Sequence, residues 1–245
     1  WAKYVYDVVC TYGEWIDVWE IWNEPDWVAD WSVTLEWPDR APTVADLPRF
    51  NGTVFDYVRM LRVSSVAAKL ADPEAQIATG GIGYASFLGA VLRYTDNPAD
   101  GSVTAEYPET GGAYIDVLSF HHYPIYSGGT SDDGVDGYLL HRVELADELD
   151  AAGVTVRGWQ TTESGAPHVT VGDHPGGAAY ARNYLMKLMV LAQAAGNDGV
   201  DWFMLSDAAA PGASDDPYAF MGLYQDVSAL VEPGGAVRTD TGQGR

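Results

Sequence analysis

The sequence predicts an α/β fold in which parallel strands alternate with helices. Two observations lead to this prediction. Short apolar runs alternate with longer amphipathic stretches along most of the chain, and several of the apolar runs are followed directly by polar residues. Apolar residues make up 47% of the 245 residues, a share typical of a globular protein with one sizeable core.

The predicted elements follow this alternation in chain order. Five apolar runs are predicted strands: 16–22, 76–79, 115–120, 154–162 and 200–205. Five amphipathic stretches are predicted helices: 1–12, 54–70, 85–95, 138–152 and 177–195. Thr53 is expected to cap the helix that follows it, and Gly153 to end the helix before it. The remaining ranges 26–50, 96–113 and 127–137 are predicted loops.

Parallel strands joined by helices form either an open sheet or a closed barrel. Asn23-Glu24, His121–Tyr123 and Glu163 each follow a different predicted strand. An open sheet gathers its chemistry at one switch point, whereas a barrel gathers it at the carboxyl ends of many strands. The distribution of polar residues therefore favours a TIM (β/α)8 barrel.

Composition narrows the function classes. Thirteen Lys and Arg residues against 35 Asp and Glu residues give a formal charge of −22, which would repel nucleic acid and anionic membranes. No apolar run reaches the length of a membrane span. Nine Trp and fifteen Tyr residues suit stacking on sugar faces, although most are expected to lie in the core. We therefore expect a carbohydrate partner, and the acidic surface hints at an extracellular or salt-rich setting.

Three short motifs resemble those of clan A glycoside hydrolases, which include cellulase-type, mannanase-type and xylosidase-type enzymes. Residues 22–25 (Trp-Asn-Glu-Pro) are similar to the Asn-Glu-Pro signature that follows strand four of that clan. Residues 121–124 (His-His-Tyr-Pro) are similar to its His-x-Tyr-Pro segment after strand six, and residues 162–165 (Thr-Glu-Ser-Gly) to its Thr-Glu-x-Gly context after strand seven. The resemblance spans about residues 16–207.

The resemblance implies a role for each motif residue. Retention requires a carboxylic acid that protonates the leaving oxygen and a carboxylate that attacks the anomeric carbon, about 5–5.5 Å apart. Glu24 would be the acid/base and Glu163 the nucleophile. Asn23 would bind the sugar 2-hydroxyl, Tyr123 would donate a hydrogen bond to Glu163, and His121 would line the site. Trp202 would form the floor of the sugar site, with Phe203 as the alternative one residue later.

The same resemblance predicts that the sequence is a fragment. If residues 16–22 are strand four, strands one to three of the barrel precede the sequence. We therefore expect residues 1–231 to form a partial (β/α)8 catalytic domain, about strands four to eight, and residues 232–245 to form a loose polar tail.

The sequence thus predicts a secreted, retaining glycosidase that cleaves β-linked oligo- or polysaccharides by double displacement. No metal or cofactor is expected. His121 and His122 are adjacent on a strand, where side chains point to opposite faces, so they would not both bind one ion. Two alternatives are an inactive carbohydrate-binding fragment of the barrel and, more distantly, a metal-dependent barrel hydrolase.

Overall fold

The computed structural model describes residues 1–224, which divide into two compact units. The first unit contains Trp1–His121 and Arg142–Gln160, and the second contains His122–His141 and the chain from Thr161 on. The proposed tail at 232–245 lies outside the described residues. In the described part of the chain, no helix has the length and apolar character needed to cross a membrane.

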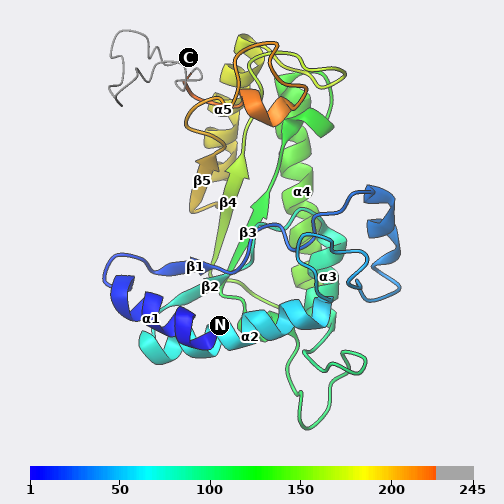
Figure 1. The fold of residues 1–245 in the computed structure, drawn as a ribbon, viewed down its shortest axis with the longest axis vertical. Coiled ribbons are helices and arrows are strands. Elements are labelled where there is room, and N and C mark those ends of the chain that lie inside the picture. Colours follow the sequence, from blue (N-terminus) through cyan, green and yellow to red (C-terminus); the bar gives the residue numbers. More distant parts are fainter. Residues whose placement is uncertain (225–245) are drawn as a thin grey trace. The chain divides into compact units, whose positions relative to one another are not determined.

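Within residues 1–224, five strands follow one another in the sheet in the same order as in the chain (Figure 1). They are β1 (Val18–Glu20), β2 (Gln76–Ala78), β3 (Val117–His121), β4 (Gly158–Ser164) and β5 (Gly199–Trp202). The pairs β1–β2 and β2–β3 are parallel. Every predicted strand has a counterpart in the structure, which confirms the predicted α/β arrangement of parallel strands.

Helices connect the strands as predicted. They are α1 (Ala2–Tyr12), α2 (Val54–Ala71), α3 (Ala85–Arg93), α4 (Ser131–Ala152) and α5 (Ala178–Ala194). Short 3-10 helices lie in the loops of the described residues, at Trp31–Glu36, Gly111–Tyr114, Pro124–Tyr126 and Pro217–Phe220. The expected cap at Thr53 is present, as a reciprocal capping box with Asp56. Gly153 follows α4 with a φ of 67°, the left-handed conformation that glycine adopts at low cost.

The core of the first unit forms where α2 packs against α1, β2 and α3 (Figure 1). Tyr57 and Leu61 of α2 are completely buried, as are Ile77 of β2 and Phe87 of α3. The long loop after β1 contributes Trp37, which is also completely buried, with its ring 5.8 Å from that of Phe87. That loop is therefore fixed to the core of the first unit.

The prediction that residues 127–137 form a loop is wrong from Ser131 on, because α4 begins there. Thr130 and Asp133 form reciprocal hydrogen bonds that satisfy free backbone N–H groups at the start of the helix. The glycines that suggested a loop permit close packing instead. A Cβ atom at Gly134 would lie 2.6 Å from Pro124, and one at Gly137 would lie 2.2 Å from Ser127.

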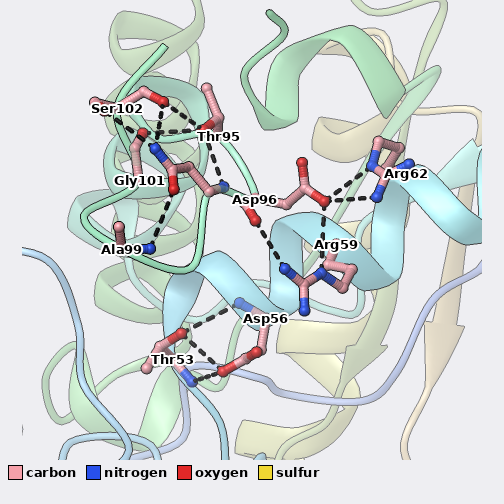
Figure 2. Close-up of polar contacts among 10 residues, drawn as sticks. Thr53, Asp56, Arg59, Arg62, Thr95, Asp96, Ala99, Gly101 and Ser102 are labelled. Carbon is pink, nitrogen blue, oxygen red and sulfur yellow. Dashed lines mark hydrogen bonds and ion pairs between the residues drawn. The ribbon is translucent and has the colours of Figure 1, made fainter. Parts of the chain in front are cut away.

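A buried carboxylate ties α2 to the segment after α3 in the first unit (Figure 2). Asp96 is 2% exposed, and its Oδ2 accepts hydrogen bonds from Nε and Nη2 of Arg62 at 2.9 and 2.7 Å. Nη2 of Arg59 donates to the backbone oxygen of Asp96 at 3.0 Å. Two arginines one helical turn apart thus converge on one residue, and the contacts hold the loop after α3 on α2.

We predict that Asp96→Ala lowers the free energy of unfolding by about 1–3 kcal/mol, because hydrogen bonds to charged groups are lost at a buried position. Urea denaturation followed by circular dichroism measures the change. Asp100→Ala is the matched control, because that exposed carboxylate accepts hydrogen bonds within its own turn, from Asn97 and Ser102. A loss for Asp96→Ala no larger than the control's would contradict the role assigned to this carboxylate.

Candidate active site

The candidate residues form two groups, one in each unit. The Glu24 cluster, in the first unit, consists of Glu24, Asp26, Arg49 and His121. The Glu163 cluster, in the second unit, consists of Tyr123, Glu163, Phe203 and Tyr218. Each group is built around one of the two motif glutamates.

The backbone at Glu24 has an unusual conformation. Trp22 and Glu24 have φ angles of 76° and 46°, a left-handed region that residues with a Cβ atom rarely adopt. Two hydrogen bonds hold this backbone: Glu24 N donates to Gly80 O at 2.7 Å, and Trp27 N donates to Glu24 O at 3.1 Å. Such strained residues persist only where their surroundings fix them, and they cluster at functional sites.

Both carboxyl oxygens of Glu24 have partners. Oε1 lies 3.1 Å from Nδ1 of His121, and Oε2 accepts a hydrogen bond from Nη1 of Arg49 at 2.9 Å. His121 ends β3 and is 4% exposed, and its ring fills the space beside Gly81. A Cβ atom at Gly81 would lie 2.1 Å from Nε2 of His121, so glycine is required there. The Gly-rich segment after β2 is therefore a close turn that leaves room for the imidazole.

Asp26 anchors the segment that carries Glu24. Its Oδ2 accepts hydrogen bonds from the backbone N–H groups of Gly83 and Tyr84, at 2.8 and 2.7 Å, just before α3. Burial of the side chain raises the pKa of Asp26 to about 7, against the effect of these two donors. Asn23, by contrast, is exposed in the loop after β1, and its contact with a sugar stays a prediction.

In the second unit, Glu163 lies next to the last residue of β4. Its Oε2 accepts a hydrogen bond from the hydroxyl of Tyr123 at 2.7 Å. Tyr123 is 8% exposed, and its ring meets those of Phe203 and Tyr218 edge-on, with centroids 6.0 and 4.7 Å away. The phenol therefore has a fixed place from which it donates to the carboxylate.

The backbone at Glu163 is held on both sides. Its oxygen accepts a hydrogen bond from His122 N at 3.1 Å. The hydroxyl of Ser164 donates to His122 O at 2.7 Å and lies 2.9 Å from the hydroxyl of Tyr184 on α5. These contacts orient the end of β4 and, with it, the Glu163 side chain.

The structure places Trp202 and Phe203 differently. Nε1 of Trp202 donates to Met221 O at 2.8 Å, and its ring lies 6.2 Å from that of Tyr184 on α5. The next residue, Phe203, packs against Tyr123 and Tyr218. Of the two residues considered for the floor of the sugar site, Phe203 is therefore the one that contacts Tyr123, the hydrogen-bond donor to Glu163.

Sequence reasoning missed Arg49, Asp26 and Tyr218. Arg49 lies in a loop without periodicity, where a single arginine carries no signal. Asp26 follows the Asn-Glu-Pro motif directly, so its position was a usable signal. Tyr218 lies in a 3-10 helix that begins at Pro217, far along the chain from the residues it contacts.

His122 has surroundings of its own in the second unit. Its ring packs 5.7 Å from Tyr138 and 5.8 Å from His141 of α4, and its Nε2 lies 3.3 Å from Gly134 O. Burial, together with the neighbouring His141, lowers the pKa of His122 to about 3, and burial lowers the pKa of His141 to about 4. Both imidazoles are therefore neutral at physiological pH.

Comparison with known proteins gives a fold but no sequence family. No family model matches the sequence, and no curated protein sequence matches it. Three solved structures are similar: a glucosidase from Croceicoccus marinus, a monomeric β-xylosidase from Caulobacter crescentus and a family 39 glycoside hydrolase from Bacteroides cellulosilyticus. Their identities to the chain are 19%, 19% and 18%, with TM-scores of 0.56, 0.52 and 0.54.

The matches cover nearly all of this chain and a smaller part of each neighbour. They cover 92%, 92% and 91% of this chain but only 42%, 42% and 40% of the respective neighbours, so the chain spans about two fifths of their length. The fold is therefore that of part of a (β/α)8 barrel, as in these similar structures. This confirms the predicted fold class, a partial (β/α)8 barrel.

The buried histidines predict a loss of stability in acid. Because the pKa of His122 is lower in the folded state than its ordinary value of 6.5, the unfolded chain takes up protons first as the pH falls. We expect the free energy of unfolding to decrease between about pH 6.5 and about pH 3.

The double variant His122→Gln/His141→Gln should show a smaller decrease over this range, because it lacks both titrating rings. Urea denaturation at a series of pH values measures the slope for each protein. An identical slope in the wild type and the double variant would show that these histidines do not cause the acid sensitivity.

Proposed function

We propose that the protein is a retaining glycoside hydrolase that cleaves a β-linked oligo- or polysaccharide by double displacement, with Glu24 as acid/base and Glu163 as nucleophile. One observation carries the proposal. Glu24 follows β1, and Glu163 lies at the end of β4. Each is held by a buried side chain, His121 for Glu24 and Tyr123 for Glu163. The similar solved structures are glycosidases, which supports glycosidic-bond hydrolysis in general.

In the first step, the carboxylate of Glu163 attacks the anomeric carbon while Glu24 gives its proton to the leaving oxygen. The carbon–oxygen bond to the leaving group breaks, and a covalent glycosyl ester forms on Glu163. In the second step, Glu24 takes a proton from water, whose oxygen attacks the anomeric carbon and releases Glu163. The proposal requires the two carboxyls to lie about 5–5.5 Å apart in the active protein.

Fixed hydrogen-bond donors suit these roles. A nucleophilic carboxylate must present one oxygen to carbon, and the hydrogen bond from the Tyr123 hydroxyl to Oε2 helps to orient the group for this. Preorganised donors lower the barrier because they need no reorientation during the reaction. Asn23 would bind the sugar 2-hydroxyl, and Phe203 or Trp202 would contact the sugar face. The charge of −22 supports a neutral sugar substrate and is compatible with secretion.

In the full-length protein, we predict that Glu163→Ala and Glu24→Ala each reduce hydrolysis of unactivated β-glycosides below detection. Azide should restore turnover of a 2,4-dinitrophenyl β-glycoside to Glu163→Gly and yield the inverted α-glycosyl azide. With Glu24→Ala it should yield the β-azide, because the glycosyl ester still forms. Proton NMR identifies each product. Wild-type turnover by either Ala variant would overturn the proposal, and sugar binding without hydrolysis by the wild type would favour a carbohydrate-binding role.

Tyr123→Phe should lower kcat on the order of 100-fold, the usual cost of one preorganised donor in an active site. The ring contacts with Phe203 and Tyr218 remain, so folding should be preserved. Tyr126→Phe is the matched control, because that exposed phenol lies 3.1 Å from the hydroxyl of Tyr218. Steady-state kinetics measures both variants, and equal kcat values would refute the role of Tyr123.

A further inference from the structure

Arg49 contacts Glu24, although no motif assigns it a role. It lies in the loop between the 3-10 helix Trp31–Glu36 and α2, and its Nη1 donates to Oε2 of Glu24 at 2.9 Å. Its guanidinium carbon lies 4.0 Å from the ring centroid of Trp27, in a cation–π contact. Trp27 is itself hydrogen-bonded through its backbone to Glu24 O. Arg49 therefore bridges the carboxyl of Glu24 and a ring three residues further along the chain.

The loop that carries Arg49 is anchored beside Glu24. The next residue, Phe50, packs edge-on against Trp22 and Tyr57, with ring centroids 5.6 Å away in each case. Tyr57 is completely buried, and its hydroxyl donates to Ile21 O at 3.2 Å, at the end of β1. The arginine thus starts from a backbone position fixed to the same strand end that carries Glu24.

Arg49 and His121 together fix the plane of the Glu24 carboxyl group. The last torsion of a glutamate is broad and roughly two-fold, so one hydrogen bond leaves the group room to turn. Here His121 contacts Oε1 and Arg49 contacts Oε2, so rotation would break one contact or both. A fixed plane determines the direction in which a proton on either oxygen points.

We propose that Arg49 is a positioning residue that orients Glu24 for proton transfer to the leaving oxygen, with Trp27 holding the guanidinium in place. The inference rests on the proposed function of Glu24. Arg49 acts through Glu24, so its contribution is largest where proton transfer matters most. Breakdown of an alkyl or sugar glycoside needs the proton of Glu24 as the carbon–oxygen bond breaks. A 2,4-dinitrophenolate leaves without one.

The test compares two leaving groups in the full-length protein. Arg49→Met retains the aliphatic length and removes the donors, and Arg49→Lys retains the charge. We measure kcat and KM on 2,4-dinitrophenyl and methyl β-glycosides of glucose, xylose and mannose. For Arg49→Met, kcat/KM on the methyl glycoside should fall at least 10-fold further than on the dinitrophenyl glycoside. Arg49→Lys should recover part of this difference.

Two controls separate positioning from a general structural effect. Arg142→Met removes another arginine that packs on an indole ring, 4.3 Å from the centroid of Trp159, and should change both substrates equally or not at all. In the double variant Glu24→Ala/Arg49→Met, the leaving-group preference should equal that of Glu24→Ala alone, because Arg49 acts through the missing carboxyl. Trp27→Leu should shift the preference in the same direction as Arg49→Met.

The outcomes distinguish this inference from the proposed function. If Glu24→Ala shows no preference for the dinitrophenyl substrate, the acid/base assignment fails. If Glu24→Ala shows the preference but Arg49→Met and Trp27→Leu lower both substrates equally, or neither, the positioning role of Arg49 is overturned. Thermal unfolding followed by circular dichroism identifies variants that do not fold. If Arg49→Met does not fold, the leaving-group preferences of Arg49→Lys and Trp27→Leu test the positioning role of Arg49.

Discussion

The Glu24 cluster depends on the close approach of backbone and side chains at Gly80 and Gly81. A Cβ atom at Gly80 would lie 2.4 Å from Ile21 O, and one at Gly81 would lie 2.1 Å from the His121 ring. Without these side chains, the turn after β2 comes near enough for Gly80 O to accept the backbone hydrogen bond of Glu24. The same space admits the buried imidazole that contacts its carboxyl. The left-handed backbone of Glu24 persists because these contacts fix it.

Both motif glutamates lie at or just beyond the end of a strand, but side chains of different kinds contact their carboxyl groups. Just after β1, Glu24 contacts the nitrogen atoms of an imidazole and a guanidinium. At the end of β4, Glu163 meets a phenol whose ring is enclosed by aromatic side chains. An acid/base must exchange protons in both steps, whereas a nucleophile must hold one oxygen in line with carbon. The contacts seen at each glutamate fit the task proposed for it.

Much of the fold follows from the sequence because apolar periodicity and capping residues are local signals. Thr53 and Gly153 mark helix ends correctly, and each apolar run overlaps a strand. The predicted start of α4 was wrong because Gly134 and Gly137 suggest a loop. In the structure these glycines allow close packing against Pro124 and Ser127. Arg49 and Tyr218 were missed for the same reason: their contacts join loops that are far apart in sequence, and no spacing rule predicts them.

In the proposed mechanism, everything after substrate binding begins with the attack of Glu163 on the anomeric carbon. The most direct test is mass spectrometry of the full-length protein after incubation with 2-deoxy-2-fluoro-β-glycosides, which form the glycosyl ester but hydrolyse slowly. We predict a stable mass increase equal to one fluorosugar, located on the peptide that contains Glu163 and absent from Glu163→Gln. An adduct on another residue, or none on a folded wild-type protein that hydrolyses the parent glycoside, would contradict it.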